Sequence, residues 1–398
     1  MKRVITLFSA LALALVGVMA TPDVGSAIPN FARQTGNPCF ACHFQNIPKL
    51  NAYGRAFKLG GYTDASTPLL EDENLSTPAT MPLGFVVKLR YQQDTKKTSS
   101  DPKKGTERGE WQLPDEAALW MAGRVNQNIG YAVEFPGGWA SGKVVFSAPI
   151  GDNRIGLSVY STDALGYAFG MEPFNTGVLR SIRMFEHRGE TSVFQKQGYG
   201  SAAQGITLYA GGNMFFAAAG LWGPVFDHAD AGFDLAMNYR LAVTPTLGGW
   251  DTMIGIAGTA GKVKCAECAE FGLDGDVVTE VKTESFGVDF QAQGELGGMQ
   301  TEIQAMYGSV GADDVLLKKS TGYNVNAQVN FNPMVGVALG YGSYTDKSGS
   351  ADKDTTAISV LLPINLSQKL TRRPEYTSYS GDGRSRDNLL TIMLFGGF

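Results

Sequence analysis

Segments in which apolar and polar residues alternate recur from Met81 to the end of the chain. A two-residue period predicts β-strands that have one apolar face and one polar face. The segments run for about ten to thirteen residues, which is longer than the strands of most globular domains. Their clearest stretches are Phe85–Tyr91, Ile129–Phe135, Phe233–Leu241, Phe286–Phe290, Tyr323–Phe331 and Val335–Tyr341.

The links between these segments alternate between short and long. Short turns at one end and long loops at the other are typical of outer-membrane barrels, and they favour a barrel over a soluble sandwich. The short links are Asn126–Asn128, Gly211–Asn213, Leu296–Gly298 and Phe331–Pro333. The long polar links are Gln93–Asp115, Thr162–Gln204, Val263–Val281, Gly311–Ser320 and Asp346–Asp354.

These patterns predict a mostly β fold, an antiparallel outer-membrane barrel of about sixteen strands over residues 81–398. An even number of strands places both barrel ends on the periplasmic side, and about sixteen strands enclose a lumen of porin size. The expected last strand, Arg386–Phe398, ends on an aromatic residue, as strands of bacterial outer-membrane proteins commonly do. Its apolar face holds Leu390, Ile392, Leu394 and Phe398.

The polar faces of the strands should line the lumen. One strand carries a column of small residues that leaves room for a plug or, equally, relieves barrel curvature: Gly336, Ala338, Gly340 and Gly342. Carboxylates expected in the lumen would favour cations, as in any cation-selective porin. They are Glu134, Asp234, Asp289, Glu295 and Glu302.

Residues 1–27 predict a cleaved secretory signal peptide. Lys2 and Arg3 precede the apolar run Val4–Ala20, and small residues suited to cleavage follow, with the cut favoured after Ala27. A membrane anchor is the alternative, but the run is near the short end for a spanning helix. The net charge of -5 over 398 residues gives no reason to expect a nucleic-acid partner. Together with the strand pattern, export predicts a location in the cell outer membrane, in contact with its lipid.

The sequence Cys39-Phe40-Ala41-Cys42-His43 has the C-x-x-C-H spacing of covalent haem attachment. Two thiols at this spacing can form thioethers to the haem vinyl groups, and the adjacent histidine can ligate the iron. A zinc site would need four ligands, yet no further Cys or His occurs between Phe44 and His187. A thioredoxin-like dithiol would need a βαβ context. The motif therefore predicts one covalently attached haem c.

Residues 28–80 should form a small, mostly helical haem-binding segment. Apolar residues near helical spacing follow the motif and could shield a haem face: Leu50, Tyr53, Phe57 and Leu59. Cations that could pair with the haem propionates, or simply lie on the surface, are Arg33, Arg55 and Lys58.

The sixth iron ligand is not evident from the motif. Histidine and methionine are the common choices, and neither occurs between Phe44 and Thr80. Met81 is the first candidate. A residue of the barrel would serve only if haem and barrel touch, and a vacant or water-filled position is also open. The barrel candidates are His187, His228, Met253 and Met306.

A second cysteine pair, Cys265 and Cys268, lacks a following histidine. By strand parity it lies in an outer loop. A disulfide is the first interpretation in an oxidising compartment. The second is a soft metal site with acidic neighbours, namely Glu267, Glu270, Asp274 and Asp276.

The stretches "FARQTG" before the motif and "PKLNAYGRAFKLGGY" after it resemble the fused cytochrome–porins in the outer membranes of iron-oxidising bacteria. The N-terminal match is fairly specific, whereas the barrel match is architectural only. The resemblance implies that the barrel houses the haem segment, carried by Cys39, Cys42 and His43. It also implies oxidation of extracellular Fe(II), a one-electron Fe(II):cytochrome oxidoreductase reaction that passes the electron to a periplasmic carrier such as a soluble cytochrome.

Two other functions stay open. One is a porin in which the haem segment is a structural or regulatory cap. The other is a conduit that carries electrons outward to an extracellular acceptor.

Overall fold

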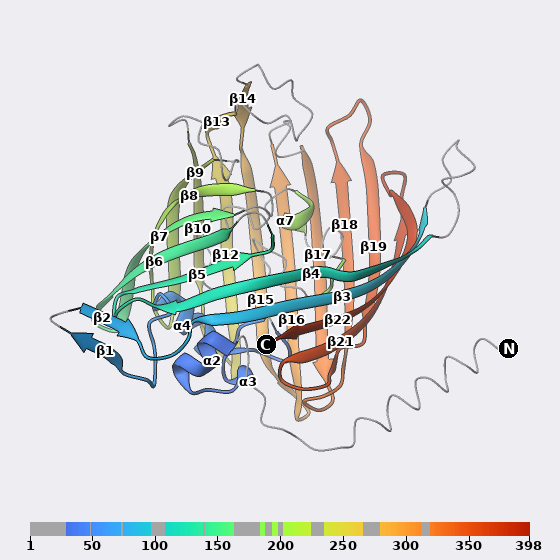
Figure 1. Ribbon diagram of the computed structural model, residues 1–398. Coiled ribbons are helices and arrows are strands. Elements are labelled where there is room, and N and C mark those ends of the chain that lie inside the picture. Colours follow the sequence, from blue (N-terminus) through green and yellow to red (C-terminus); the bar gives the residue numbers. More distant parts are fainter. Residues whose placement is uncertain are drawn as a thin grey trace.

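The computed structural model describes residues 29–47, 49–72, 75–96, 108–137, 140–162, 184–187, 193–197, 202–223, 235–265, 279–311 and 319–398. In these residues sixteen long antiparallel strands form a closed barrel (Figure 1). They are β3 (Leu83–Lys96), β4 (Arg108–Arg124), β5 (Ile129–Phe135), β6 (Ser141–Ile150), β7 (Asn153–Thr162), β8 (Ala203–Gly211), β9 (Phe215–Gly223), β10 (Ala236–Val243), β12 (Trp250–Ala260), β15 (Ser285–Leu296), β16 (Met299–Val310), β17 (Ser320–Asn330), β18 (Gly336–Asp346), β19 (Lys353–Leu361), β21 (Leu370–Ser380) and β22 (Arg386–Gly397).

Closure comes from the pairing of the last strand with the first. β22 pairs with β3 from Arg386↔Lys96 to Gly397↔Val86. The short strands β11 (Thr246–Leu247) and β20 (Ile364–Asn365) lie in the links after β10 and β19 and pair with the strands that follow. The predicted mostly β barrel is therefore confirmed, including its strand number.

The strands present their apolar side chains outward. In β17, Asn326 and Gln328 face the lumen with at most 3% exposure, whereas Tyr323 and Val325 on the other face are 46% and 47% exposed. Such an exterior is stable in lipid and unfavourable in water. Further outward apolar residues are Leu208, Met237, Leu241, Leu339 and Ile358. This inside-out pattern confirms the predicted location in the outer membrane.

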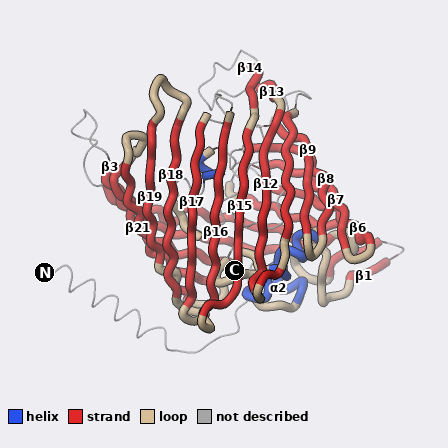
Figure 2. Tube along the Cα trace, turned by 180° about the vertical axis from the view of Figure 1, so that it is seen from behind, coloured by secondary structure: helices blue, strands red, loops and turns tan. Residues whose placement is uncertain are grey.

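Short turns collect at one end of the barrel and long links at the other (Figures 1 and 2). In the turn between β15 and β16, Gly297 and Gly298 have φ of 60° and 78°, as a two-residue hairpin requires. The predicted link Gln93–Asp115 is too long, because β3 continues to Lys96 and β4 already begins at Arg108. The polar residues at both ends of this link belong to the strands, because they pair across the ladder between β3 and β4.

The long-loop end also carries a separate two-stranded hairpin. It consists of β13 (Lys262–Cys265) and β14 (Thr279–Lys282), which extend the link between β12 and β15. This agrees with the predicted side of the loop with the second cysteine pair. Cys265 ends β13, while Cys268 lies outside the described residues, so the disulfide and the metal site both stay predictions.

Three short helices precede the barrel: α2 (Pro29–Thr35), α3 (Cys39–Cys42) and α4 (Ala52–Leu59). They lie at the short-turn end (Figures 1 and 2). The hairpin of β1 (Leu69–Asp72) and β2 (Leu75–Pro78) leads from them to β3. We call the described part of residues 29–66 the plug. No helix in the described chain is long and apolar enough to cross a membrane.

An aromatic cluster and a helix cap stabilise the plug. Phe31 stacks on Tyr62 with ring centroids 5.1 Å apart, and Phe57 meets Phe31 edge-on. Asn51 caps the N-terminus of α4, and its side-chain oxygen accepts a hydrogen bond from the Gly54 N–H at 2.9 Å.

A buried ion pair joins the plug to the barrel wall. Lys49 Nζ lies 2.6 Å from Glu302 Oε2 on β16, and both side chains are fully buried. Lys49 also donates to the side-chain oxygens of Gln45 and Gln328. Three glutamines of the wall donate to the other Glu302 oxygen: Gln291, Gln293 and Gln304. Because both buried charges have partners, the polar plug can pack against the barrel wall inside the lumen.

Parts of the long link between β7 and β8 also lie in the lumen. They are residues 184–187 and 193–197, the latter including α7 (Val193–Lys196) (Figure 1). The Glu375 carboxylate of β21 accepts the backbone N–H groups of Glu186 at 2.7 Å and His187 at 2.9 Å. We call residues 184–187 the lumen segment.

The predicted column of small residues makes room for this segment. A Cβ on Gly340 would lie 2.9 Å from the Phe185 ring. The same relation holds for Gly287, where a Cβ would lie 2.0 Å from the Phe194 ring. At Gly340, the structure supports the interpretation that a small residue leaves space in the lumen.

Lys49→Met should destabilise the protein by about 3–5 kcal/mol, because it leaves the Glu302 charge buried without its cation. Urea unfolding in lipid vesicles measures the free energy, and limited proteolysis reports release of the plug. The double variant Lys49→Met/Glu302→Gln should recover most of the loss. Lys353→Met, at an exposed lysine, is the control. Equal unfolding free energies for the Lys49 and Lys353 variants would contradict the anchoring role.

Candidate haem-attachment site

The two cysteines of the motif bracket a single helical turn. α3 begins at Cys39 and ends at Cys42, and the His43 N–H donates to the Cys39 carbonyl at 3.0 Å. Residues three apart on a helix share a face, so both thiols can reach one planar ligand. Both cysteines are free thiols in the structure.

The imidazole of His43 is oriented through one nitrogen. Nδ1 lies 3.1 Å from the carbonyl oxygen of Lys49. Histidines that bind metals usually donate one ring N–H to a carbonyl or carboxylate, which sets the tautomer and presents the other nitrogen to the metal. The donor set therefore fits a haem iron, with Nε2 as the ligating atom.

Close packing of α4 holds the motif in place. Asn51 donates from its backbone N–H to the Cys42 carbonyl at 3.0 Å and from its side chain to the Ala41 carbonyl at 2.9 Å. A Cβ on Gly54 would lie 2.3 Å from the Cys42 carbonyl oxygen, so only glycine allows this approach.

Cys39 faces an apolar patch of the barrel wall. It is 1% exposed and belongs to one buried cluster with residues of the plug, β3 and β22, namely Ile47, Val86, Met393 and Phe395. Its N–H donates to the Gln368 side chain in the turn before β21. Cys42 and His43 are half-buried. Sequence reasoning missed Met393 and Gln368, although alternation with the outward Ile392 and Leu394 already assigned Met393 to the lumen face.

Burial raises the pKa of the Cys39 and Cys42 thiols to about 11. Either thiol is therefore harder to deprotonate than an exposed cysteine. No group of three or more His, Cys, Asp or Glu side chains that could hold a metal ion occurs in the described part of the chain. Attachment of a haem at this site stays a prediction.

The predicted propionate partners have other contacts. Arg55 forms an ion pair with Asp251 of β12 at 2.5 Å, and Arg33 donates to the Leu83 carbonyl. Both arginines thus join the plug to the barrel. Lys58 is half-buried on α4.

The predicted candidates for the sixth ligand differ in their surroundings. Met81 is 65% exposed at the rim, before β3. Met253 and Met306 belong to the large core cluster without Cys39. Both nitrogens of His187 contact threonine hydroxyls, Nδ1 with Thr377 at 2.6 Å and Nε2 with Thr391 at 2.7 Å. His228 lies outside the described residues.

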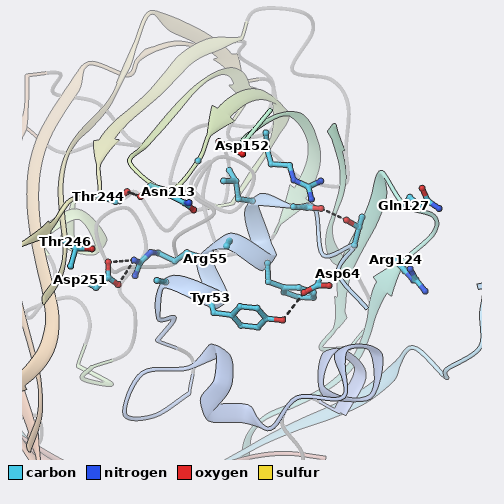
Figure 3. A pocket seen from close by; sticks show the side chains of 18 residues that line it. Tyr53, Arg55, Asp64, Arg124, Gln127, Asp152, Asn213, Thr244, Thr246 and Asp251 are labelled. Carbon is cyan, nitrogen blue, oxygen red and sulfur yellow. Dashed lines mark hydrogen bonds and ion pairs between the residues drawn. The ribbon is translucent and has the colours of Figure 1, made fainter. Parts of the chain in front are cut away.

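An open cavity of about 620 Å³ lies beside α4 at the short-turn end (Figure 3). Its wall includes the Arg55–Asp251 pair and Tyr53, whose hydroxyl donates to Asp64 at 2.9 Å. The motif does not line it. This cavity is therefore separate from the candidate haem-attachment site.

Comparison with known proteins identifies the fold but not a family. No protein-family model matches the sequence, and no curated protein matches it. Solved outer-membrane proteins are similar in structure. OprB of Pseudomonas putida has 11% identity and a TM-score of 0.57, covering 79% of this chain and 94% of its own. OmpF of Salmonella typhi, in complex with daunomycin, has 11% identity and a TM-score of 0.50, covering 83% and 100%.

A loop-deletion mutant of OmpT from Vibrio cholerae has 12% identity and a TM-score of 0.50, covering 79% of this chain and 99% of its own. The likeness at such low identity shows a porin-type outer-membrane barrel. The predicted fused cytochrome–porin family is supported in its porin half, and its cytochrome half stays a proposal.

Gly54→Ala should lower the amount of covalently bound haem several-fold, because the added Cβ forces α4 away from the Cys42 carbonyl. The measurement is haem absorbance per protein after denaturing electrophoresis, in a host that attaches haem c. Gly137→Ala, where a Cβ meets nothing within 4 Å, is the control. Equal haem content in both variants would show that this packing does not position the motif.

Proposed function

We propose that this chain is an outer-membrane electron-transfer protein, a barrel whose plug carries one haem c at Cys39, Cys42 and His43. The observation that carries the proposal is the contact of His43 Nδ1 with the Lys49 carbonyl, beside a C-x-x-C turn and inside a barrel mouth. A channel has no need of an imidazole held in this way.

The bound haem would supply a one-electron couple that changes oxidation state without bond breaking. The chain's own residues would do the rest. Cys39 and Cys42 retain the cofactor in a wet lumen. The Lys49 carbonyl holds the Nδ1 proton of His43. Val86 and Phe395 keep water from the Cys39 edge.

The position of the motif indicates from which side of the membrane an electron carrier would reach the haem. The plug lies at the short-turn end, which faces the periplasm in outer-membrane barrels. A periplasmic carrier such as a soluble cytochrome could approach the half-buried Cys42 and His43. An external donor would then have to enter the lumen to reach a haem at this end.

We propose extracellular Fe(II) as the donor, and this step rests on the resemblance of the motif region to the fused cytochrome–porins. The lumenal carboxylates give it less support than expected. Asp289 pairs with Arg240 at 2.6 Å and Glu302 pairs with Lys49. Asp234 lies outside the described residues.

The second candidate function is a channel with a haem-bearing cap. The comparisons agree better with this function than with Fe(II) oxidation, since the similar structures are porins. Against it stands the plug, which forms a fully buried ion pair with the barrel wall inside the lumen. An outward electron conduit would use the same site, and it differs from the first proposal only in redox potential.

Purified protein should carry haem that survives denaturation, and Cys39→Ala/Cys42→Ala should abolish it. Oxidised wild-type protein mixed with Fe(II) in a stopped-flow instrument should show rapid haem reduction near neutral pH. In planar bilayers its conductance should be small compared with that of an open porin of sixteen strands. A haem that stays oxidised under excess Fe(II), together with large conductance, would favour the channel.

A further inference from the structure

The methionines buried in the lumen fall into separate clusters. In the described chain the methionines with at most 5% exposure are Met184, Met253, Met306 and Met393. Met253 and Met306 lie in the large core cluster, and Met184 packs with Phe185. Met393, 2% exposed, is the one of these four that shares a cluster with Cys39.

Met393 lies between the plug and the lumen segment. On the inner face of β22 its neighbours are Phe395, in the Cys39 cluster, and Thr391, whose hydroxyl contacts His187 Nε2. Successive inward residues of a strand are about 7 Å apart. The Met393 side chain therefore lies about 7 Å deeper in the barrel than Phe395 and about 7 Å before Thr391, which contacts the lumen segment.

Arginines on the two adjacent strands flank Met393. Arg373 of β21 and Arg90 of β3 are the register partners of Met393. Arg373 donates to the Met184 carbonyl, and Arg90 pairs with Glu186 at 3.0 Å. Both arginines thus tie the lumen segment to the wall on either side of Met393, which limits the space beside its side chain.

We propose that the Met393 thioether would be the sixth ligand of the haem iron and would hold the cofactor together with His43. The inference rests on the proposed haem. A thioether is a common partner of histidine in cytochromes c and raises the reduction potential. His187 would have to give up a hydrogen bond to Thr377 or Thr391, and Met81 is largely exposed. The barrel would then complete the cofactor site that the plug begins.

The test uses absorption spectra and redox titration of the full-length protein with Met393→Leu, which conserves side-chain volume. Wild type should show the weak near-infrared charge-transfer band of a ferric haem with a thioether ligand. The variant should lose this band, have a lower midpoint potential and bind added imidazole faster. Met306→Leu and Met81→Leu are matched controls and should keep the wild-type spectrum.

Three results would overturn the proposal: no such band in wild type, retention of the band in Met393→Leu, or loss of the band in Met81→Leu alone. Where the leucine variant does not fold, Met393→His gives the answer, since it should replace the thioether spectrum with that of two imidazoles. Wild-type protein without covalent haem would instead refute the proposed function, so the two failures are distinguishable.

Discussion

A strand that crosses lipid must have every backbone N–H and C=O group hydrogen-bonded, because the bilayer core offers no water. A sheet meets this demand only by closing on itself, and pairing of β22 with β3 does so here. Closure then turns one face of every strand toward lipid and the other toward the lumen. The outward Val325 and the inward Asn326 of β17 follow from that single constraint.

A closed barrel of this size encloses space that water or protein must fill. In this chain protein fills part of it from two directions. The plug lies at the short-turn end and is joined to the wall by the Lys49–Glu302 and Arg55–Asp251 pairs. The lumen segment lies deeper in the barrel than the plug, and its backbone N–H groups are held by the Glu375 carboxylate. Together they occupy part of a porin-type barrel, and the C-x-x-C-H turn lies at its short-turn end.

The strands could be predicted from sequence because period-2 alternation is local, as in Tyr323–Phe331, and because Gly297-Gly298 encodes a tight turn within two residues. The contacts that hold segments inside the lumen could not, since they join positions far apart in the sequence. Gln45 donates to the Gln300 carbonyl, 255 positions away. Cys39, Cys42 and His43 were evident from their spacing alone. The wall residues around them, Val86, Gln368 and Met393, became evident only when closure brought β3 and β22 together.

Mass spectrometry most directly tests the claim that the plug carries a haem. The protein would be isolated from the outer membrane of a host that matures c-type cytochromes and then digested. The account predicts one haem bound through both thiols of the peptide that contains Cys39 and Cys42, and no haem elsewhere. An unmodified peptide, whether its thiols are free or joined as a disulfide, would contradict it.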